Sequence, residues 1–245
     1  MKYFLLSLIL LFSLSCSEKQ TSLESPQESK IEVLPDVPKP ERVWNVAFLI
    51  MEGVYNTELT APMDIFQHSI FHTDPGMKVF TIAKSLEPIK SFEGLVITPD
   101  YSYSSGEYPA IDILVVPSAE HHLDTDLEDE EMITFVKETG AKTKYNMSLC
   151  DGAFVLAKAG LLDGLESTTF PSDIDRYKEM FPQLSVHRDV IFVHDKNAIT
   201  GAGGAKSFEP ALYLCELLYG KKAADGIARG LVIDWEVGEV PKKVF

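Results

Sequence analysis

The amino-acid sequence predicts one α/β domain, a three-layer α/β/α sandwich with a mostly parallel sheet. Short apolar or β-branched runs recur along the chain, and such runs suit strands that are buried on both faces of a parallel sheet. Segments with helix signals separate them, so strands alternate with helices. The chain has 245 residues, 45% of them hydrophobic, which is enough for one such core.

Four of the apolar runs are predicted to be single strands. They cover residues 43–51, 77–83, 111–117 and 144–149. A hairpin is expected at 189–203, because an Asp-Lys-Asn turn at 195–197 separates two further runs.

The segments between these strands predict helices. The predicted helices cover residues 61–71, 127–139, 173–181 and 207–220. Pro62 stands near the expected first turn of the first helix, where its missing N–H is tolerated. The second helix begins with acidic side chains and has Lys137 near its end, as the helix dipole favours. Gly220 is a typical residue at the end of the last helix.

The charge of the chain excludes one class of partner. The formal net charge is −15 and the pI is near 4.8. Nucleic-acid binding relies on clustered Lys and Arg that displace counterions from phosphates. We therefore expect neither DNA nor RNA as a partner.

The first sixteen residues predict export. "MKYFLLSLILLFSLSC" has one Lys, an apolar stretch at 3–12 and small residues ahead of Cys16. The apolar stretch is short for a membrane span, and its end resembles a bacterial lipobox, in which Cys16 carries the lipid. Ordinary signal cleavage nearby is the alternative. The interpretation is a protein exported to the bacterial cell envelope and anchored to a membrane by lipid.

Residues 17–42 are predicted to form a disordered tether. This segment contains four prolines, many charges and no aromatic residue. The folded domain is therefore expected at 43–245.

The sequence indicates no metal and no cofactor. His121 and His122 are adjacent, and neighbouring residues of an extended segment point in opposite directions, so they rarely bind one ion together. No phosphate-binding glycine motif or Walker motif is present, and the glycines of "GAGGA" near residue 203 lack the acidic partner of a dinucleotide site.

Cys150 stands where a predicted strand ends and a helix of small residues begins. At such a joint the helix directs its N–H groups toward the sulfur and favours the thiolate. Gly152 and Ala153 fit the crowding of a sharp turn. We therefore interpret Cys150 as a reactive nucleophile. The other interpretation, a buried structural thiol, fits Cys215 inside an apolar helix.

The segment "SLCDGAFVLAKAGLLDGLESTTF" at 148–170 resembles the nucleophile elbow of the ThiJ/PfpI superfamily, in the branch of isonitrile hydratases and the amidase-like domains of AraC-type regulators. Four more segments resemble that branch in the same order. They are "ELTAPMDIF", "DILVVPSA", "ITGAGGAKSFEPALYL" and "ADGIARGLVIDW". The resemblance implies a flavodoxin-like, class I glutamine amidotransferase-like fold.

The resemblance also implies roles for particular residues. Cys150 would be the nucleophile, and Glu58 the acidic residue beside it, acting as general acid or base or hydrogen-bonding the sulfur. The backbone N–H groups of Ala119 and Asp151 would stabilise a developing anion. Relatives usually have Gly-Gly where this chain has Ser118 and Ala119.

Two positions depart from the family pattern. Phe170 stands where relatives that use a histidine commonly place it, so a Cys-His pair there is excluded. Asp151 replaces the Thr that follows the cysteine in isonitrile hydratases. A carboxylate beside the sulfur would raise the pKa of the thiol and oppose the helix dipole.

The expected function is chemistry on a small electrophilic or nitrogen-containing molecule by a hydratase, a hydrolase or a glyoxalase-like lyase. Two alternatives stay open: a small-molecule-binding domain without catalysis, like the sensor domains of AraC-type regulators, and a redox or stress-protection protein in which Cys150 is oxidised reversibly. The resemblance implies a homo-oligomer, with a dimer expected.

Overall fold

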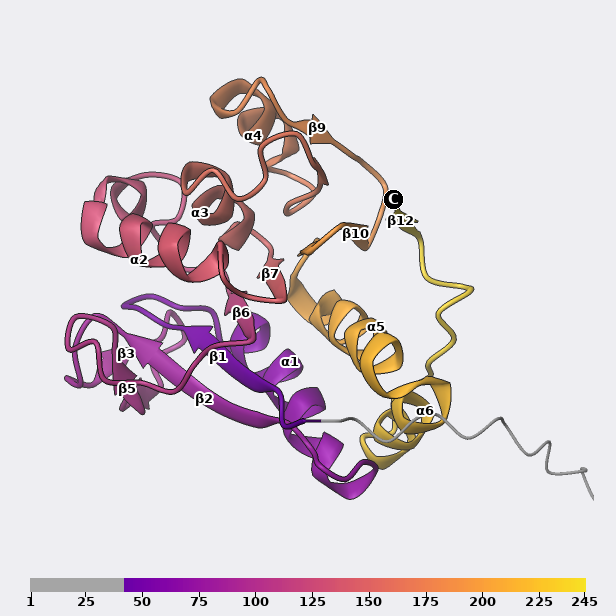
Figure 1. The fold of residues 1–245 in the computed structure, drawn as a ribbon. Coiled ribbons are helices and arrows are strands. Elements are labelled where there is room, and N and C mark those ends of the chain that lie inside the picture. Colours follow the sequence, from indigo (N-terminus) through magenta and orange to yellow (C-terminus); the bar gives the residue numbers. More distant parts are fainter. Residues whose placement is uncertain (1–41) are drawn as a thin grey trace, which may run out of the picture. The chain divides into compact units, whose positions relative to one another are not determined.

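The computed structural model describes residues 42–245 (Figure 1). The predicted leader at 1–16 with its lipid site Cys16, and the predicted tether at 17–42 apart from its last residue, lie outside the described residues. No helix in the described part is long and apolar enough to cross a membrane.

An eight-stranded sheet forms the centre of the domain, in the order β12-β10-β11-β7-β6-β1-β2-β5. Its strands are β1 (Asn45–Leu49), β2 (Lys78–Ala83), β5 (Tyr101–Ser102), β6 (Ile113–Val116), β7 (Tyr145–Leu149), β10 (Phe192–Asp195), β11 (Ala198–Gly201) and β12 (Lys242–Val244). All neighbours in this sheet are parallel except β10 and β11, which form the predicted hairpin. The mostly parallel sheet is therefore confirmed.

Helices cover both faces of the sheet, as the sequence predicts (Figure 1). One face carries α1 (Asn56–His68), α5 (Phe208–Tyr219) and α6 (Lys221–Gly230). The other carries α2 (Glu130–Gly140), α3 (Gly152–Lys158) and α4 (Ile174–Met180). The predicted three-layer sandwich is confirmed.

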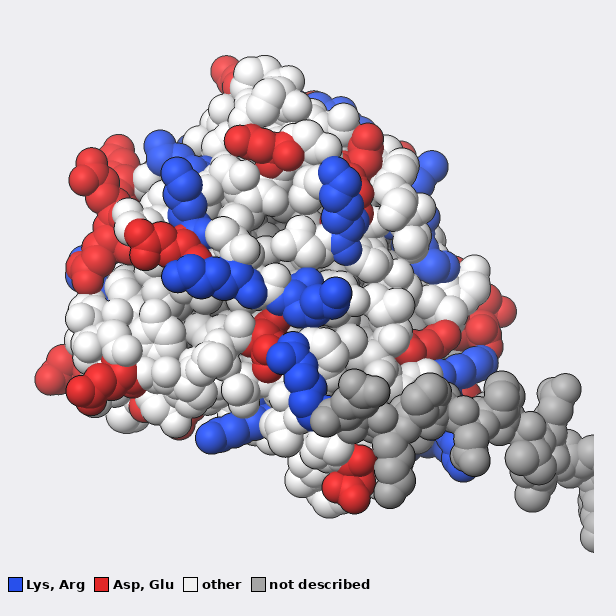
Figure 2. Space-filling model, in the orientation of Figure 1, with Lys and Arg blue, Asp and Glu red and all other residues white. Residues whose placement is uncertain are grey.

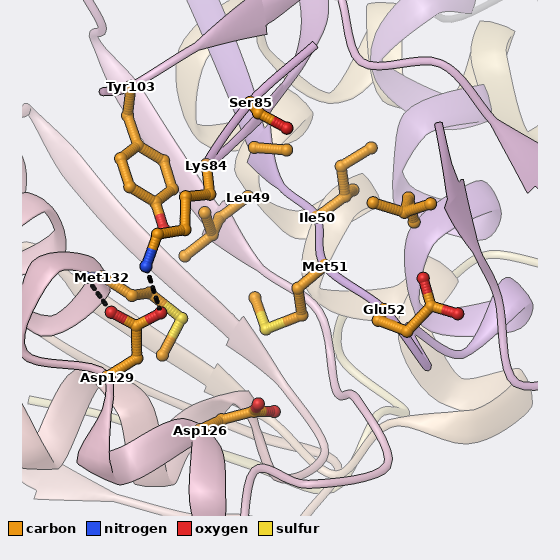
Figure 3. Close-up of a pocket in the computed structure, with 12 residues that line it drawn as sticks. Leu49, Ile50, Met51, Glu52, Lys84, Ser85, Tyr103, Asp126, Asp129 and Met132 are labelled. Atoms are coloured by element: carbon orange, nitrogen blue, oxygen red, sulfur yellow. Dashed lines mark hydrogen bonds and ion pairs between the residues drawn. The ribbon is translucent and has the colours of Figure 1, made fainter. Parts of the chain in front are cut away.

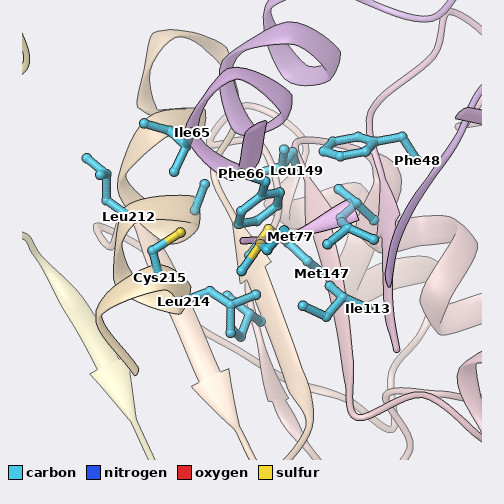
Figure 4. Close-up of a cluster of buried hydrophobic side chains, with 14 of the residues drawn as sticks. Phe48, Ile65, Phe66, Met77, Ile113, Met147, Leu149, Leu212, Leu214 and Cys215 are labelled. Carbon is cyan, nitrogen blue, oxygen red and sulfur yellow. The ribbon is translucent and has the colours of Figure 1, made fainter. Parts of the chain in front are cut away.

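The central strands supply side chains to two separate cores. Along β1, Val46 and Phe48 pack on the side of α1, whereas Ala47 and Leu49 pack on the side of α3. This alternation is the period of an extended strand, and both faces are apolar because both are covered. Figure 4 shows part of the first core, in which Cys215 is fully buried, as expected for a structural thiol.

The first helix differs from its predicted start. α1 begins at Asn56, so Pro62 lies inside the helix and not near its first turn. Proline there removes one intrahelical hydrogen bond, the one that would reach the carbonyl of Glu58. The buried apolar side of α1, with Ile65 and Phe66 fully enclosed, holds the helix together across that gap.

Several short elements were not predicted. They are β3 (Ile89–Lys90), β4 (Val96–Ile97), β8 (Glu166–Ser167), β9 (Ser185–Val186) and the 3-10 turn η3 (Gly204–Ser207). The 3-10 turn η1 (Ser69–Phe71) forms the end of the predicted helix at 61–71, and η2 (Thr125–Glu128) overlaps the start of the one predicted at 127–139. The three-residue strand β12 and the two-residue strand β5 at the sheet edges also went unpredicted. Runs of two to four residues are too short to show a period of two or 3.6.

Candidate functional site

Cys150 occupies a sharp turn between β7 and α3. Its φ is +55°, in the left-handed region, and its backbone N–H donates to the carbonyl of Gly201 over 2.9 Å. A non-glycine residue in this conformation costs of order 1–3 kcal/mol and persists only where the surroundings hold it. The structure therefore places Cys150 at the carboxyl edge of the sheet, where open α/β sheets bind ligands.

Two glycines allow other segments to approach this turn. A Cβ atom on Gly152 would lie 2.0 Å from the carbonyl oxygen of Val116, at the end of β6. A Cβ on Gly203, whose φ is +83°, would lie 2.3 Å from the Cβ of Cys150. The sequence predicted the crowding at Gly152. It did not predict that Gly203, far along the chain, presses against the cysteine.

The environment of the sulfur keeps it protonated. Cys150 is only 7% exposed. Burial, followed by the charge of Asp151, raises the pKa of the Cys150 thiol well above its usual range. The thiolate expected from the helix start is therefore not the resting form, because desolvation outweighs the dipole of α3.

The carboxyl group of Asp151 lies between the sulfur and a buried threonine. Its Oδ2 accepts a hydrogen bond from Cys150 Sγ at 3.7 Å, and its Oδ1 accepts one from Thr169 Oγ1 at 3.1 Å. Burial and then the charge of Asp173 raise the pKa of Asp151 to about 6. From the sequence we predicted a role for the backbone N–H of Asp151 and an effect of its side-chain charge. The hydrogen bond from the Thr169 hydroxyl to the Asp151 carboxyl was not predicted.

Glu58 is buried in the first half of α1, on the side facing η3. Its Oε1 accepts a hydrogen bond from the backbone N–H of Gly204 at 2.8 Å. Its charge is a further cause of the raised pKa of Cys150. Among the hydrogen bonds of residues 42–245, none joins Glu58 directly to the sulfur.

The second expected anion donor is already engaged. The N–H of Ala119 donates to Nδ1 of His122 at 3.2 Å, so it points at a histidine and not into an open site. His122 is fully buried, and burial lowers its pKa to about 3. Its Nε2 lies 3.1 Å from the sulfur of Met51. The two adjacent histidines therefore lie in different surroundings: His122 is buried, whereas His121 is exposed and forms an ion pair with Asp124.

A cavity of about 450 Å³ lies next to the turn. Gly203 and Thr169, both in contact with Cys150, line it, together with Phe170. Its other lining residues are Thr168, Pro171, Ile174, Arg188, Asp189, Val190, Ile191, Ala202, Lys206 and Pro241. Most of these are apolar, so the cavity suits a small ligand with an apolar part.

Figure 2 shows a hollow in the middle of one face of the domain, with Lys and Arg side chains around it. Asp and Glu side chains stand among them and toward the edges of that face. Positive side chains are thus present around the hollow although the chain as a whole has a net charge of −15.

A second cavity, of about 200 Å³, lies beyond the ends of β1 and β2 (Figure 3). Lys84 crosses it to Asp129, with a distance of 3.1 Å between Nζ and Oδ2. Met51 forms part of the wall of this cavity and contacts His122, which in turn accepts the hydrogen bond from the N–H of Ala119. The side chains of Met51 and His122 therefore lie between this cavity and the loop that contains Ala119. Within residues 42–245, no three His, Cys, Asp or Glu side chains are grouped to hold a metal ion.

Comparison with known proteins relates this arrangement to one family. The DJ-1/PfpI family model matches residues 44–217. The chain is 30% identical to the isonitrile hydratase of Pseudomonas putida, over 73% of this chain and 74% of the enzyme. It is 25% identical to the HTH-type transcriptional regulator GbdR of Pseudomonas aeruginosa over 58% of this chain, and it spans only 37% of that regulator.

Solved structures show the same fold. A THiJ/PfpI family protein from Pseudomonas syringae superposes with a TM-score of 0.72 at 27% identity, covering 86% of this chain and 84% of the other. An AraC family transcriptional regulator from Pseudomonas putida superposes with a TM-score of 0.68 at 22% identity, covering 77% and 99%.

Proposed function

This chain belongs to the DJ-1/PfpI family, and we propose that it is a cysteine-dependent enzyme acting on a small electrophilic or nitrogen-containing molecule. One observation carries the proposal: Cys150 is held in the left-handed region at a strand-to-helix turn, next to a cavity of about 450 Å³. Backbone strain of this kind is typical of functional positions, and two of the residues that line the cavity, Thr169 and Gly203, contact Cys150.

In this proposal the sulfur of Cys150 adds to an electrophilic carbon of the substrate. The backbone N–H of Asp151 stabilises the developing negative charge, and Glu58 serves the proton transfers on the bound substrate. The N–H of Ala119 joins as a second donor only when its hydrogen bond to His122 is exchanged for one to the substrate.

A hydratase is the favoured reaction class. The similarity to isonitrile hydratase extends over about three quarters of both chains. The largely apolar lining of the cavity supports a substrate with a small apolar substituent, such as an alkyl isonitrile. A hydrolase or a glyoxalase-like lyase would use the same addition step.

The experiment is a turnover assay with small isonitriles and methylglyoxal. We expect one of them to be consumed by the intact protein and by Cys215→Ser, and not by Cys150→Ala. Cys215 is the matched control because it is a buried thiol in α5, outside the site. Equal turnover by Cys150→Ala would contradict the role of this cysteine.

Binding without catalysis is the second candidate. It is favoured by the protonated resting state of Cys150 and by the similarity to AraC-type regulators. Saturable binding of a small molecule in calorimetry, with no turnover of any substrate tested, would support this candidate over the enzyme.

The location and assembly of the protein belong to the same proposal. We propose lipid attachment at Cys16 and a place in the bacterial cell envelope, on the basis of the leader pattern. A homodimer is proposed on the basis of the family, and light scattering of the purified domain tests it.

A further inference from the structure

The proton of the Cys150 thiol must leave when the sulfur forms a bond, so the group that faces this proton matters. Within residues 42–245, the thiol donates one hydrogen bond, to Oδ2 of Asp151 at 3.7 Å. The distance is within the range for a sulfur donor, and the pair is almost wholly shielded from water, at 7% and 8% exposure. The carboxyl oxygen is therefore placed to receive the proton without an intervening group.

Among the bases of residues 42–245, only Asp151 is hydrogen-bonded to the sulfur. Glu58 uses Oε1 to accept from the N–H of Gly204. His122 uses Nδ1 to accept from the N–H of Ala119, and the side chain at position 170 is phenylalanine. Neither Glu58 nor His122 is hydrogen-bonded to the sulfur in the described arrangement, so neither can take the thiol proton without moving.

Thr169 fixes the direction of the Asp151 carboxyl. The hydroxyl lies 3.1 Å from Oδ1 and 3.0 Å from the carbonyl oxygen of Cys150. Both oxygens are acceptors and a hydroxyl has one proton, so Thr169 can turn between them as the charge on the carboxyl changes. With Oδ1 held in this way, Oδ2 is left to face the sulfur.

We propose that Asp151, oriented by Thr169, is the general base that accepts the Cys150 proton. This inference rests on the proposed function, in which Cys150 is the nucleophile. It gives the chain a cysteine–aspartate pair in place of the cysteine–histidine pair that Phe170 excludes, and it makes Thr169 a positioning residue.

The step balances without a co-reactant. The S–H bond breaks and its proton passes to Oδ2 of Asp151, while the sulfur forms a bond to the electrophilic carbon. In a carbonyl substrate the π electron pair moves to the oxygen, and Asp151 or Glu58 then protonates that oxygen. In an isonitrile the π electron pair moves to the nitrogen while the attacked carbon keeps its lone pair, and Asp151 or Glu58 then protonates that carbon, which gives a thioimidate. In both cases the thiol is added to the substrate with no oxidation or reduction.

The titration of the site agrees with this role. With a pKa of about 6, Asp151 is mostly a carboxylate at pH 7 and can accept a proton. Because this pKa is within about one unit of pH 7, the protonated carboxyl can also donate the proton to the substrate in a later step. The other charged or titratable groups that act on this pair are Asp173 and Glu58, and Tyr55 lies near enough to feel both Cys150 and Asp151.

The test is the rate of Cys150 alkylation by iodoacetamide between pH 5 and 10, in the full domain and in Asp151→Asn. If Asp151 only repels the thiolate, removing its charge lowers the pKa of the thiol and the variant reacts faster at neutral pH. If Asp151 is the base, the variant reacts more slowly at pH 7, by about 100-fold, the low end of general-base contributions. The two outcomes differ in sign.

Thr169→Val and Thr168→Val provide a matched pair. Both remove a buried hydroxyl, but that of Thr168 bonds to His187 and not to Asp151. We expect the wild-type rate to rise with a midpoint near pH 6, and Thr169→Val alone to move this midpoint upward, because the lost hydrogen bond stabilised the carboxylate. An unchanged midpoint in Thr169→Val, or a faster Asp151→Asn, would overturn the inference.

The alkylation assay needs no substrate, so it separates this inference from the proposed function. Slow alkylation of Asp151→Asn together with no turnover of any substrate would support Asp151 as the base of Cys150 and contradict the proposed enzymatic function. Turnover that depends on Cys150, together with faster alkylation of Asp151→Asn, would keep the enzyme and reject the base. Asp151→Thr, the residue expected in isonitrile hydratases, repeats the test if the Asn variant does not fold.

Discussion

The backbone N–H of Gly204 donates to Oε1 of Glu58 over 2.8 Å and joins two residues that are 146 positions apart in the chain. This hydrogen bond fixes the start of η3 against α1. The preceding residue, Gly203, is thereby held against Cys150. An acidic residue expected to serve the chemistry thus also holds the loop that closes one side of the cysteine.

Gly203→Ala is expected to destabilise the protein and disturb the turn. The new Cβ would lie 2.3 Å from the Cβ of Cys150, at a φ of +83°. Overpacking and the left-handed conformation together cost about 3 kcal/mol. The control is Gly164→Ala, where φ is +71° and nothing lies within 4 Å, so only about 1 kcal/mol is expected. Urea unfolding measures both, and equal losses would contradict the close contact.

Asp151→Asn is expected to change how stability depends on pH. The folded pKa of about 6 lies above the ordinary value of 3.8, so the folded protein holds this proton more tightly than the unfolded chain. The contribution to stability is fully present below about pH 4 and is lost as the pH rises through about 6. Between about pH 4 and pH 7, the free energy of unfolding of the wild type should therefore fall by about 3 kcal/mol relative to that of Asp151→Asn. A parallel pH dependence of the two proteins would reject the raised pKa.

His122 is expected to destabilise the protein in acid. Burial holds its pKa at about 3, below the usual 6.5, so the imidazole must stay neutral in the fold. The unfolded chain binds the proton first, and stability falls by several kcal/mol as the pH drops from about 6.5 toward 3. His122→Gln should reduce this acid sensitivity, whereas His121→Gln, at an exposed position, should not. The measurement is the urea unfolding midpoint of the wild type and both variants at pH 4 and pH 7. An equal change in acid sensitivity in His122→Gln and His121→Gln would contradict the assignment to His122.

Cys16→Ser is expected to abolish lipid labelling of the full chain. Cells expressing the intact protein and fed radiolabelled palmitate should yield a labelled band in the membrane fraction, since the lipid would be attached at Cys16. Cys150→Ser should retain the label. Labelling that persists in Cys16→Ser would contradict the proposed anchor.

Much of the fold follows from local patterns in the sequence. The four buried runs became β1, β2, β6 and β7, and the turn at 195–197 became a hairpin, because a buried strand has to be apolar over its whole length. The start of α1 was wrong by five residues. Pro62 is typical of a first turn, but tertiary packing of the helix tolerated it further in.

The sequence by itself determined that Cys150 lies between a strand pattern and a helix pattern and that Asp151 follows it, because local patterns and the order of residues are both read directly from the chain. Only the tertiary structure decided that burial keeps the thiol protonated, that His122 takes the N–H of Ala119, and that Thr169 holds the carboxyl. The physical reason is that a pKa and a hydrogen-bond partner depend on which loops meet at the sheet edge, and no local period in a sequence records that meeting.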